Sequence, residues 1–296
     1  MCHVTKRRAS VIVLACLALV AVGCRDLRFL VPPASSGGGR YHSEVFTQVT
    51  KTSDIIYGSS VNQQGQTVSL GMDLYEPSGD SFDARPAIVW VHGGSFRSGS
   101  KASPEIVDQA NVFARKGYVN VSISYRLSPN GCTVINAECI TAIIDAKHDA
   151  QAAVRYLRAN ASTLRIDTTR IAIAGTSAGA ITALNVGYGP EDPGTSGSPG
   201  FDSSVSAAVS LSGARLLTTA NAGEAAALLF HGTADSLVPH QWAVDTVAEA
   251  KGAGLTAYLT TWDGAGHVPY VQNRTAILDQ TSNFLYWTLT PYASGH

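Results

Sequence analysis

Charged residues are scarce in this chain of 296 residues, because Lys, Arg, Asp and Glu together make up 15% of it. The 21 basic residues fall to 18 without Lys6, Arg7 and Arg8, against 22 acidic residues. There is thus no basic excess of the kind that marks a nucleic-acid-binding surface. The sequence predicts no nucleic-acid partner.

A long apolar run is also lacking, since the one at residues 11–22 is too short to span a bilayer comfortably. It follows the basic residues near the N-terminus, an order typical of an export signal. We expect residues 1–24 to be a signal peptide and the mature protein to be periplasmic, anchored at the cell surface, or secreted. Small and apolar residues precede Cys24, as in the lipid-modified cysteine of bacterial lipoproteins, which predicts a membrane tether; an ordinary signal-peptidase cut nearby is the alternative. Residues 25–44, with PPASSGGG at 32–39, have the composition of a flexible tether.

Cysteine is rare, with five in the chain. Cys2 and Cys16 lie in the expected signal and Cys24 is the lipidation candidate, which leaves Cys132 and Cys139 as a pair in one loop. An oxidising compartment favours a disulfide between them. Two thiols without a nearby histidine pair do not favour a metal site, and we expect neither a metal nor another cofactor.

The remainder, residues 45–296, shows no internal repeat and fits one α/β domain. Apolar runs alternate with helical patterns, which predicts a mostly parallel sheet with helices on both faces and an antiparallel hairpin at its N-terminal edge. The expected strands are 45–57, 66–76, 86–91, 119–125, the run at 171–174, 205–212, 226–230 and 256–262. The expected helices are 104–116, 140–160, one after Ser177, 240–252 and 274–289.

The sequence GTSAG at 175–179 follows an apolar strand and opens a helical stretch. A nucleophilic serine on a sharp strand-to-helix turn needs neighbours without side chains, one for the turn and one for close approach of strand and helix. Ser177 is therefore the candidate nucleophile.

Paired glycines follow another expected strand, in HGGSF at 92–96. Backbone N–H groups of Gly93 or Gly94, together with that of Ala178, are placed to stabilise an oxyanion. His92 and Tyr125 are expected to support this loop rather than to react, and a tight turn without function is the alternative.

The acid and the base should follow the serine along the chain, in that order. Asp235 comes just past the strand at 226–230 and is the favoured acid, with Asp263 as runner-up. His267 lies in a Gly-rich loop after the strand at 256–262 and is the favoured base, since His240 is too close to Asp235 in sequence. Each of these residues follows a strand, so they should meet at the carboxyl edge of the sheet, where ligands bind.

At these residues the chain resembles the α/β-hydrolase family, in its esterase and lipase branch with an HGG motif and a G-x-S-x-G turn. The matching segments are HGGSF at 92–96, YRLSP at 125–129, GTSAG at 175–179, HGTAD at 231–235 and GAGH at 264–267. Thr176 stands where hormone-sensitive-lipase-like esterases usually have an acid, so the pattern looks closer to bacterial carboxylesterases and feruloyl-esterase-like enzymes. The resemblance implies an α/β-hydrolase fold and hydrolysis of carboxylic esters.

The predicted function is an exported serine esterase acting on short-acyl or aryl esters, such as acetyl or feruloyl esters, either as small molecules or linked to a polymer. Little sequence is available for a cap, which predicts an open site. Phe96, Trp242 and Tyr270 are candidates to line it. Two alternatives are a non-catalytic binding protein on the same fold and a serine peptidase. Asp145, His148 and Asp149 share a helix face, but we expect local pairing there, with Asp149 bracing Arg126, rather than a metal site.

Overall fold

The structure is a computed structural model that describes residues 39–290. The predicted signal peptide at 1–24, the lipidation candidate Cys24 and residues 25–38 of the predicted tether lie outside the described residues. Within residues 39–290, no helix is both long and apolar enough to cross a membrane.

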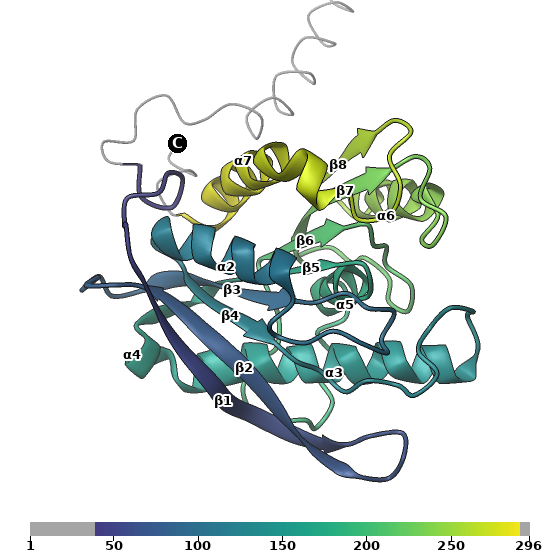
Figure 1. The fold of residues 1–296 in the computed structure, drawn as a ribbon, viewed down its shortest axis with the longest axis horizontal. Helices are drawn as coiled ribbons and strands as arrows, with labels where there is room; N and C mark the ends of the chain where they lie inside the picture. The colour runs from purple at the N-terminus through teal and green to yellow at the C-terminus, as the bar shows by residue number, and fades with distance from the viewer. Residues whose placement is uncertain (1–38, 291–296) are drawn as a thin grey trace, which may run out of the picture.

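Eight strands form one sheet in the order β1-β2-β4-β3-β5-β6-β7-β8 (Figure 1). The pairs β1/β2 and β2/β4 are antiparallel and every other pair is parallel. The strands are β1 (Val49–Val61), β2 (Thr67–Pro77), β3 (Arg85–Val91), β4 (Val119–Ile123), β5 (Ile166–Thr176), β6 (Ala207–Leu211), β7 (Ala226–Gly232) and β8 (Ala257–Trp262). The helices are α2 (Pro104–Arg115), α3 (Ala137–Ala159), α4 (Ala161–Leu164), α5 (Ala178–Gly187), α6 (His240–Gly252) and α7 (Tyr270–Leu289). The predicted α/β architecture and the antiparallel N-terminal edge are confirmed.

The central strands are buried on both faces, which is why they form uninterrupted apolar runs. In β3 every residue is buried, and successive side chains enter opposite layers. Ala87, Val89 and Val91 pack in the layer that contains α3, α5 and α6. Ile88 and Trp90 pack in the layer of α2 and α7, which lie together over one face of the sheet (Figure 1).

Several predicted boundaries were wrong by a few residues. The first strand begins at Val49 rather than at 45, because the backbone N–H groups of Val45 and Phe46 bind the carbonyl of Arg115. The last helix begins at Tyr270 rather than at 274, and a kink at Asn273 (φ −117°) separates its first turn from the amphipathic part. The short helix α4 was not predicted.

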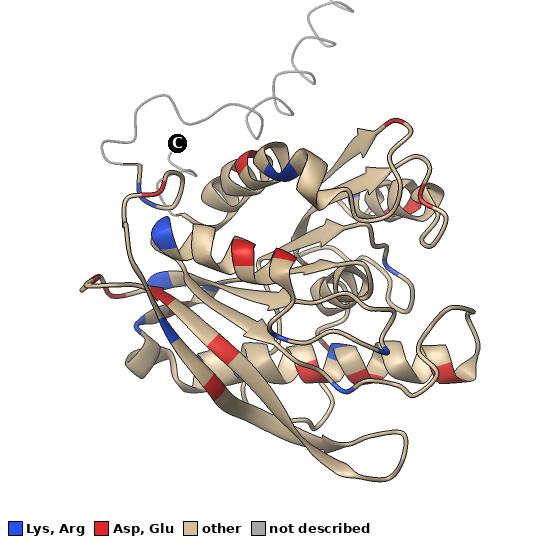
Figure 2. Ribbon diagram, in the orientation of Figure 1, with Lys and Arg blue, Asp and Glu red and all other residues tan. Residues whose placement is uncertain are grey.

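No helix covers the carboxyl edge from residues 188–206 or 212–225, the two longer connections after α5. The first of these is bound to α3 and β1 instead, since Arg155 donates to the carbonyls of Pro193 and Gly197 and Ser59 N–H donates to the carbonyl of Ser196. Neither connection therefore forms a large cap over the carboxyl edge, as the sequence predicted for these residues. Figure 2 shows Lys and Arg interspersed with Asp and Glu over the helices and outer strands.

Asp149 of α3 braces Arg126, as predicted. Its carboxylate accepts hydrogen bonds from the Arg126 backbone N–H at 2.8 Å and from the guanidinium at 2.8 and 3.0 Å. Asp145 lies 2.9 Å from the same guanidinium, and His148 lies 3.0 Å from Asp192. The helix face with three potential ligands is thus occupied by protein partners.

Candidate active site

Ser177 occupies a strained turn between β5 and α5, with φ 54° and ψ −118°. A Cβ atom on Gly175 would lie 2.2 Å from the carbonyl oxygen of Gly179, and one on Gly179 would lie 2.1 Å from that of Val91. Both contacts are far inside van der Waals distance, so only glycine fits at either position. The two glycines of the motif therefore have separate steric causes, and the turn they permit presents the serine at the carboxyl edge of the sheet.

Ser177, His267 and Asp235 form one hydrogen-bonded chain. The distance from His267 Nε2 to Ser177 Oγ is 2.7 Å, and that from His267 Nδ1 to Asp235 Oδ2 is 2.8 Å. The Asp235 side chain is fully buried, whereas the imidazole keeps 18% of its surface exposed. A buried carboxylate, an imidazole and a hydroxyl in this order can activate the hydroxyl as a nucleophile.

Asp235 is held as a carboxylate by its neighbours. Its Oδ1 accepts hydrogen bonds from the backbone N–H groups of Leu237 and Val238 at 2.9 and 3.0 Å. Burial acts to raise the pKa of Asp235, but the hydrogen bonds from His267, Val238 and Leu237 outweigh it and hold the pKa below its ordinary value. The runner-up acid, Asp263, instead accepts a hydrogen bond from Thr233 Oγ1 at 3.0 Å.

The loops after β7 and β8 are joined through their backbones, which fixes Asp235 relative to His267. Thr233 N–H donates to the carbonyl of Trp262 at 3.0 Å, and Ala234 N–H donates to that of Ala265 at 2.9 Å. A Cβ atom on Gly232 would lie 2.2 Å from the Ala265 oxygen, so this close approach requires glycine.

Two further side chains support the site without having been singled out from the sequence. His231, fully buried, donates from Nε2 to the carbonyl of Val238 at 2.8 Å, and the same nitrogen lies 3.1 Å from Asp235 Oδ2. Ser212, at the end of β6 with φ 58°, accepts a hydrogen bond at Oγ from Val268 N–H at 3.0 Å. The signal for Ser212 was its position as the last residue of the strand expected at 205–212, at the carboxyl edge of the sheet.

The HGG loop lies against the nucleophile. A Cβ atom on Gly93 would be 3.2 Å from Ser177 Cβ. Within the described residues, no hydrogen bond uses the backbone N–H of Gly93, Gly94 or Ala178, whereas that of Ser177 donates to the carbonyl of Leu211. These three N–H groups are available to an oxyanion beside Ser177, and Ser177 N–H is not.

His92 and Tyr125 support this loop, as expected. The two rings stack at 4.3 Å, and Tyr125 donates to the His92 carbonyl at 3.1 Å. Burial lowers the pKa of His92 to about 4, so the ring is neutral and its Nδ1–H donates to the carbonyl of Gly93 at 2.7 Å. A neutral, fully buried imidazole in this position supports the loop through these contacts.

The predicted disulfide between Cys132 and Cys139 is present. It connects the loop before α3 to the first turn of that helix, where Asn136 caps the Cys139 N–H at 2.9 Å. Cys132 N–H donates to the carbonyl of Ser95 at 2.8 Å, and Ser128 N–H donates to that of Phe96 at 2.7 Å. Because Ser95 and Phe96 both have positive φ, at 52° and 58°, the disulfide-bonded loop supports an unusual backbone conformation directly after Gly93 and Gly94.

The three predicted lining residues have different surroundings. Phe96 is 1% exposed and packs in the core against Tyr125, and Trp242 on α6 is partly buried against the same core. Tyr270 is the one of the three whose position suits a lining role. It borders a groove of about 390 Å³ that starts at Val268, the residue after His267.

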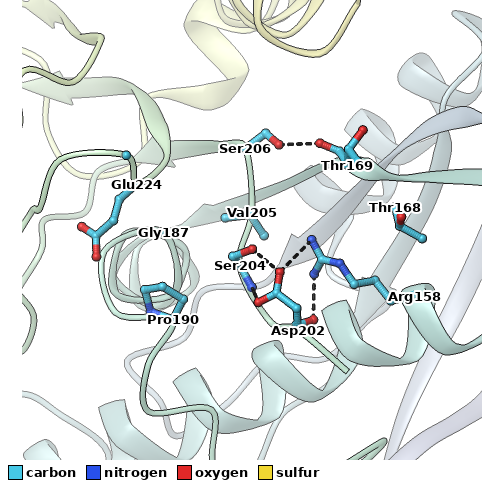
Figure 3. A pocket seen from close by; sticks show the side chains of 11 residues that line it. Arg158, Thr168, Thr169, Gly187, Pro190, Asp202, Ser204, Val205, Ser206 and Glu224 are labelled. Carbon is cyan, nitrogen blue, oxygen red and sulfur yellow. Dashed lines mark hydrogen bonds and ion pairs between the residues drawn. The ribbon is translucent and has the colours of Figure 1, made fainter. Parts of the chain in front are cut away.

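A larger cavity, of about 610 Å³, lies at the opposite edge of the sheet, before β6 and near the start of β5 (Figure 3). Its polar side chains bind one another or nearby backbone: Ser204 and Arg158 contact Asp202, and Ser206 donates to the carbonyl of Thr169. No triad residue lines it. The candidate triad therefore lies at the carboxyl edge and not at this cavity.

The strand order and the serine turn are those of an α/β-hydrolase fold. Residues 72–214 match the family model described as BD-FAE, and residues 203–293 match that of the TAP-like protein family. Among solved structures, esterase 2 of Thermogutta terrifontis phosphorylated by paraoxon is 26% identical, with a TM-score of 0.68 over 80% of this chain and 95% of that one.

Two further relatives have named activities. The chain is 28% identical over 183 residues to a chlorogenic acid esterase of Aspergillus niger, across 57% of this chain and 35% of that protein. It is 31% identical over 122 residues to a phenmedipham hydrolase of Pseudarthrobacter oxydans, across 41% of this chain and 23% of that protein. The chain thus spans much less than two thirds of either relative.

Proposed function

We propose that this chain is a serine hydrolase of carboxylic esters, with Ser177 as nucleophile, His267 as base and Asp235 as the acid that orients the base. The observation that carries the proposal is the continuous hydrogen-bonded chain of these three side chains, at 2.7 and 2.8 Å. Available backbone N–H groups beside Ser177 add the second requirement of acyl transfer, a site for the oxyanion.

In the first step, Ser177 Oγ attacks the ester carbonyl while its proton passes to His267 Nε2. Negative charge on the carbonyl oxygen is stabilised by the N–H groups of Ala178 and of Gly93 or Gly94. The protonated imidazole is stabilised by Asp235 and then gives its proton to the departing alcohol oxygen as the C–O bond breaks.

In the second step, water attacks the acyl-enzyme while its proton passes to His267 Nε2. The imidazole then returns that proton to Ser177 Oγ as the bond between this oxygen and the acyl carbon breaks, which releases the acid and restores Ser177. Nothing in this cycle requires a metal or an organic cofactor.

Short-acyl and aryl esters are the proposed substrates, free or attached to a polymer. The absence of a helical cover over the carboxyl edge in residues 39–290 supports access for a bulky substrate. The similarity to a chlorogenic acid esterase supports aryl esters among these. The competing non-catalytic role is disfavoured by the intact and correctly spaced triad.

We further propose that the protein is exported and tethered through Cys24. The basic and apolar start of the chain supports export, as does the disulfide between Cys132 and Cys139, a bond typical of oxidising compartments. Mass spectrometry of the N-terminus after expression in a bacterium that processes lipoproteins tests this. A mature protein that begins at Cys24 with a diacylglyceryl group supports the tether. A mature protein that begins at another residue without a lipid contradicts it.

The test of the activity is hydrolysis of 4-nitrophenyl esters, from acetyl to long acyl groups, and of a feruloyl ester by the full chain and by Ser177→Ala. We expect hydrolysis of the short and aryl esters and its loss in the variant. A folded wild-type protein that cleaves none of them contradicts the proposal, and cleavage of peptide amides faster than esters would support the peptidase alternative.

A further inference from the structure

A groove is lined by the first turns of α2 and α7 and by Val268, which follows His267 in the chain. The two helices lie over the same face of the sheet (Figure 1). Its lining consists of Pro104, Glu105 and Asp108 from α2 and Val268, Tyr270, Val271 and Arg274 from the loop and first turns of α7. A volume of about 390 Å³ is within the range of small-molecule sites.

We propose that this groove holds the alcohol portion of the ester and selects uncharged or cationic alcohols over anionic ones. The inference rests on the proposed esterase function and adds the class of leaving group to it. It has three supports: the position relative to His267, the rigid base of the groove, and the balance of charges around it.

Position assigns the groove to the alcohol side. His267 must deliver its proton to the departing alcohol oxygen, so that oxygen has to lie beside the imidazole, while the carbonyl oxygen lies towards Gly93 and Ala178. The lining of the groove includes the very next residue, Val268, whose N–H is bound to Ser212 Oγ at 3.0 Å. A group attached to the departing oxygen can therefore extend into it.

The base of the groove is fixed by hydrogen bonds between the helices. Tyr270 donates to Asp108 Oδ2 at 2.6 Å, and Arg274 binds both oxygens of the same carboxylate at 2.6 and 2.8 Å. Tyr270 N–H is also bound to the carbonyl of Val268 at 2.8 Å. The aromatic wall is thus held in place before a ligand arrives, which lowers the entropic cost of binding an apolar group.

The charges around the groove leave one carboxylate without a charged side-chain partner. Asp108 and Arg274 neutralise each other, and Arg115 and Glu44 pair with each other at 2.5 Å nearby. In the described part of the chain, the Glu105 carboxylate has no hydrogen bond or ion pair. An anionic alcohol would be repelled by it, and a cationic one attracted.

The experiment compares acetate esters of three phenols that carry a neutral methyl, an anionic carboxylate or a cationic trimethylammonium group at the meta position. The full chain, Glu105→Gln and Val271→Lys are assayed for kcat/KM. Asp279→Asn is the matched control, because Asp279 is an exposed acid on α7 that does not line the groove.

We expect the ratio of kcat/KM for the anionic ester to that for the neutral ester to rise about threefold or more in Glu105→Gln, from the Coulomb interaction of unit charges several ångströms apart. Val271→Lys should raise it further and lower the ratio for the cationic ester. The control should leave both ratios as in the wild type. Unchanged ratios in both groove variants, or equal changes in the control, overturn the proposal.

A second arm separates the two sides of the ester. With a neutral phenol held constant, the succinyl ester carries a negative charge on the acyl side and the acetyl ester carries none. Neither groove variant should change the ratio of kcat/KM for the succinyl ester to that for the acetyl ester. A shift confined to the succinyl ester would assign the groove to the acyl group and overturn the inference. Hydrolysis that persists in Ser177→Ala would instead refute the proposed function itself, so the two failures are distinct.

Discussion

Replacing Asp235 with Asn tests the site most directly, because the surrounding hydrogen bonds dictate how the amide must orient. Two backbone N–H groups, from Leu237 and Val238, donate to Oδ1. The amide oxygen has to occupy this position, since an NH₂ group there would face two donors. The NH₂ group is then directed at His267 Nδ1, in the place of Oδ2.

An amide donor facing Nδ1 requires that nitrogen to be unprotonated. The proton of the neutral imidazole then sits on Nε2, 2.7 Å from Ser177 Oγ, where it blocks acceptance of the serine proton. Loss of the base by a change of tautomer costs about 10⁴-fold in kcat, or about 5 kcal/mol of transition-state stabilisation. The fold should survive, because the Oδ1 hydrogen bonds are kept.

The assay is kcat and KM on 4-nitrophenyl acetate, with circular dichroism and thermal unfolding to verify folding. Asp263→Asn is the matched control: it changes the runner-up acid, whose partner is Thr233, and should stay within about twofold of the wild type, as expected for a surface substitution. A folded Asp235→Asn variant that keeps more than a tenth of the activity would refute the reasoning. A large loss in Asp263→Asn instead would make that residue the acid.

Three further predictions concern stability. Replacing Cys132 and Cys139 together by Ser should lower the free energy of unfolding by about 2–3 kcal/mol, because the small ring no longer restricts the unfolded chain; equal urea midpoints for variant and non-reduced wild type would contradict this. Asp149→Ala should cost about 3–5 kcal/mol in urea unfolding, because it leaves the buried guanidinium of Arg126 without its main partner, and a cost below 1 kcal/mol would show that this ion pair is not structural. For Asp73, burial acts to raise the pKa, but hydrogen bonds from two lysines outweigh it and hold the pKa below the ordinary 3.8. The ionised Asp73 carboxylate therefore contributes fully to stability above that value, and the contribution is lost as the pH falls through the lower folded pKa. The free energy of unfolding in urea should decline more steeply below about pH 4 for the wild type than for Asp73→Asn. Parallel declines would be evidence against this linkage.

Most of the fold was predictable because its signals are local. Strands buried on both faces, such as β3, must be continuous apolar runs, and the glycines of GTSAG are required by contacts of 2.1 and 2.2 Å that no other residue satisfies. The order of serine, acid and base along the chain, with each residue placed after a strand, favoured Ser177, Asp235 and His267 and left Asp263 as the alternative acid. The structure brings the three favoured residues within hydrogen-bonding distance.

Boundaries were less predictable where contacts distant in sequence decide them. The start of β1 depends on the carbonyl of Arg115, and the first turn of α7 is held by the bond from Tyr270 to Asp108 on α2. Neither partner is visible in a local hydrophobic pattern. Phe96 likewise resembled a lining residue by its position next to the glycines, but a positive φ of 58° accompanies its burial in the core.

The sequence by itself therefore determined the α/β architecture, the serine turn, the candidate triad and the cysteine pair, because each depends on residue type at short spacing. Only the tertiary structure places Asp235 against His267 and Asp263 against Thr233. It also brings His231 and Ser212 to the site and forms the groove between α2 and α7. These features depend on how loops and helices far apart in the chain meet at one edge of the sheet. That geometry is set by packing across the whole domain and not by any single segment.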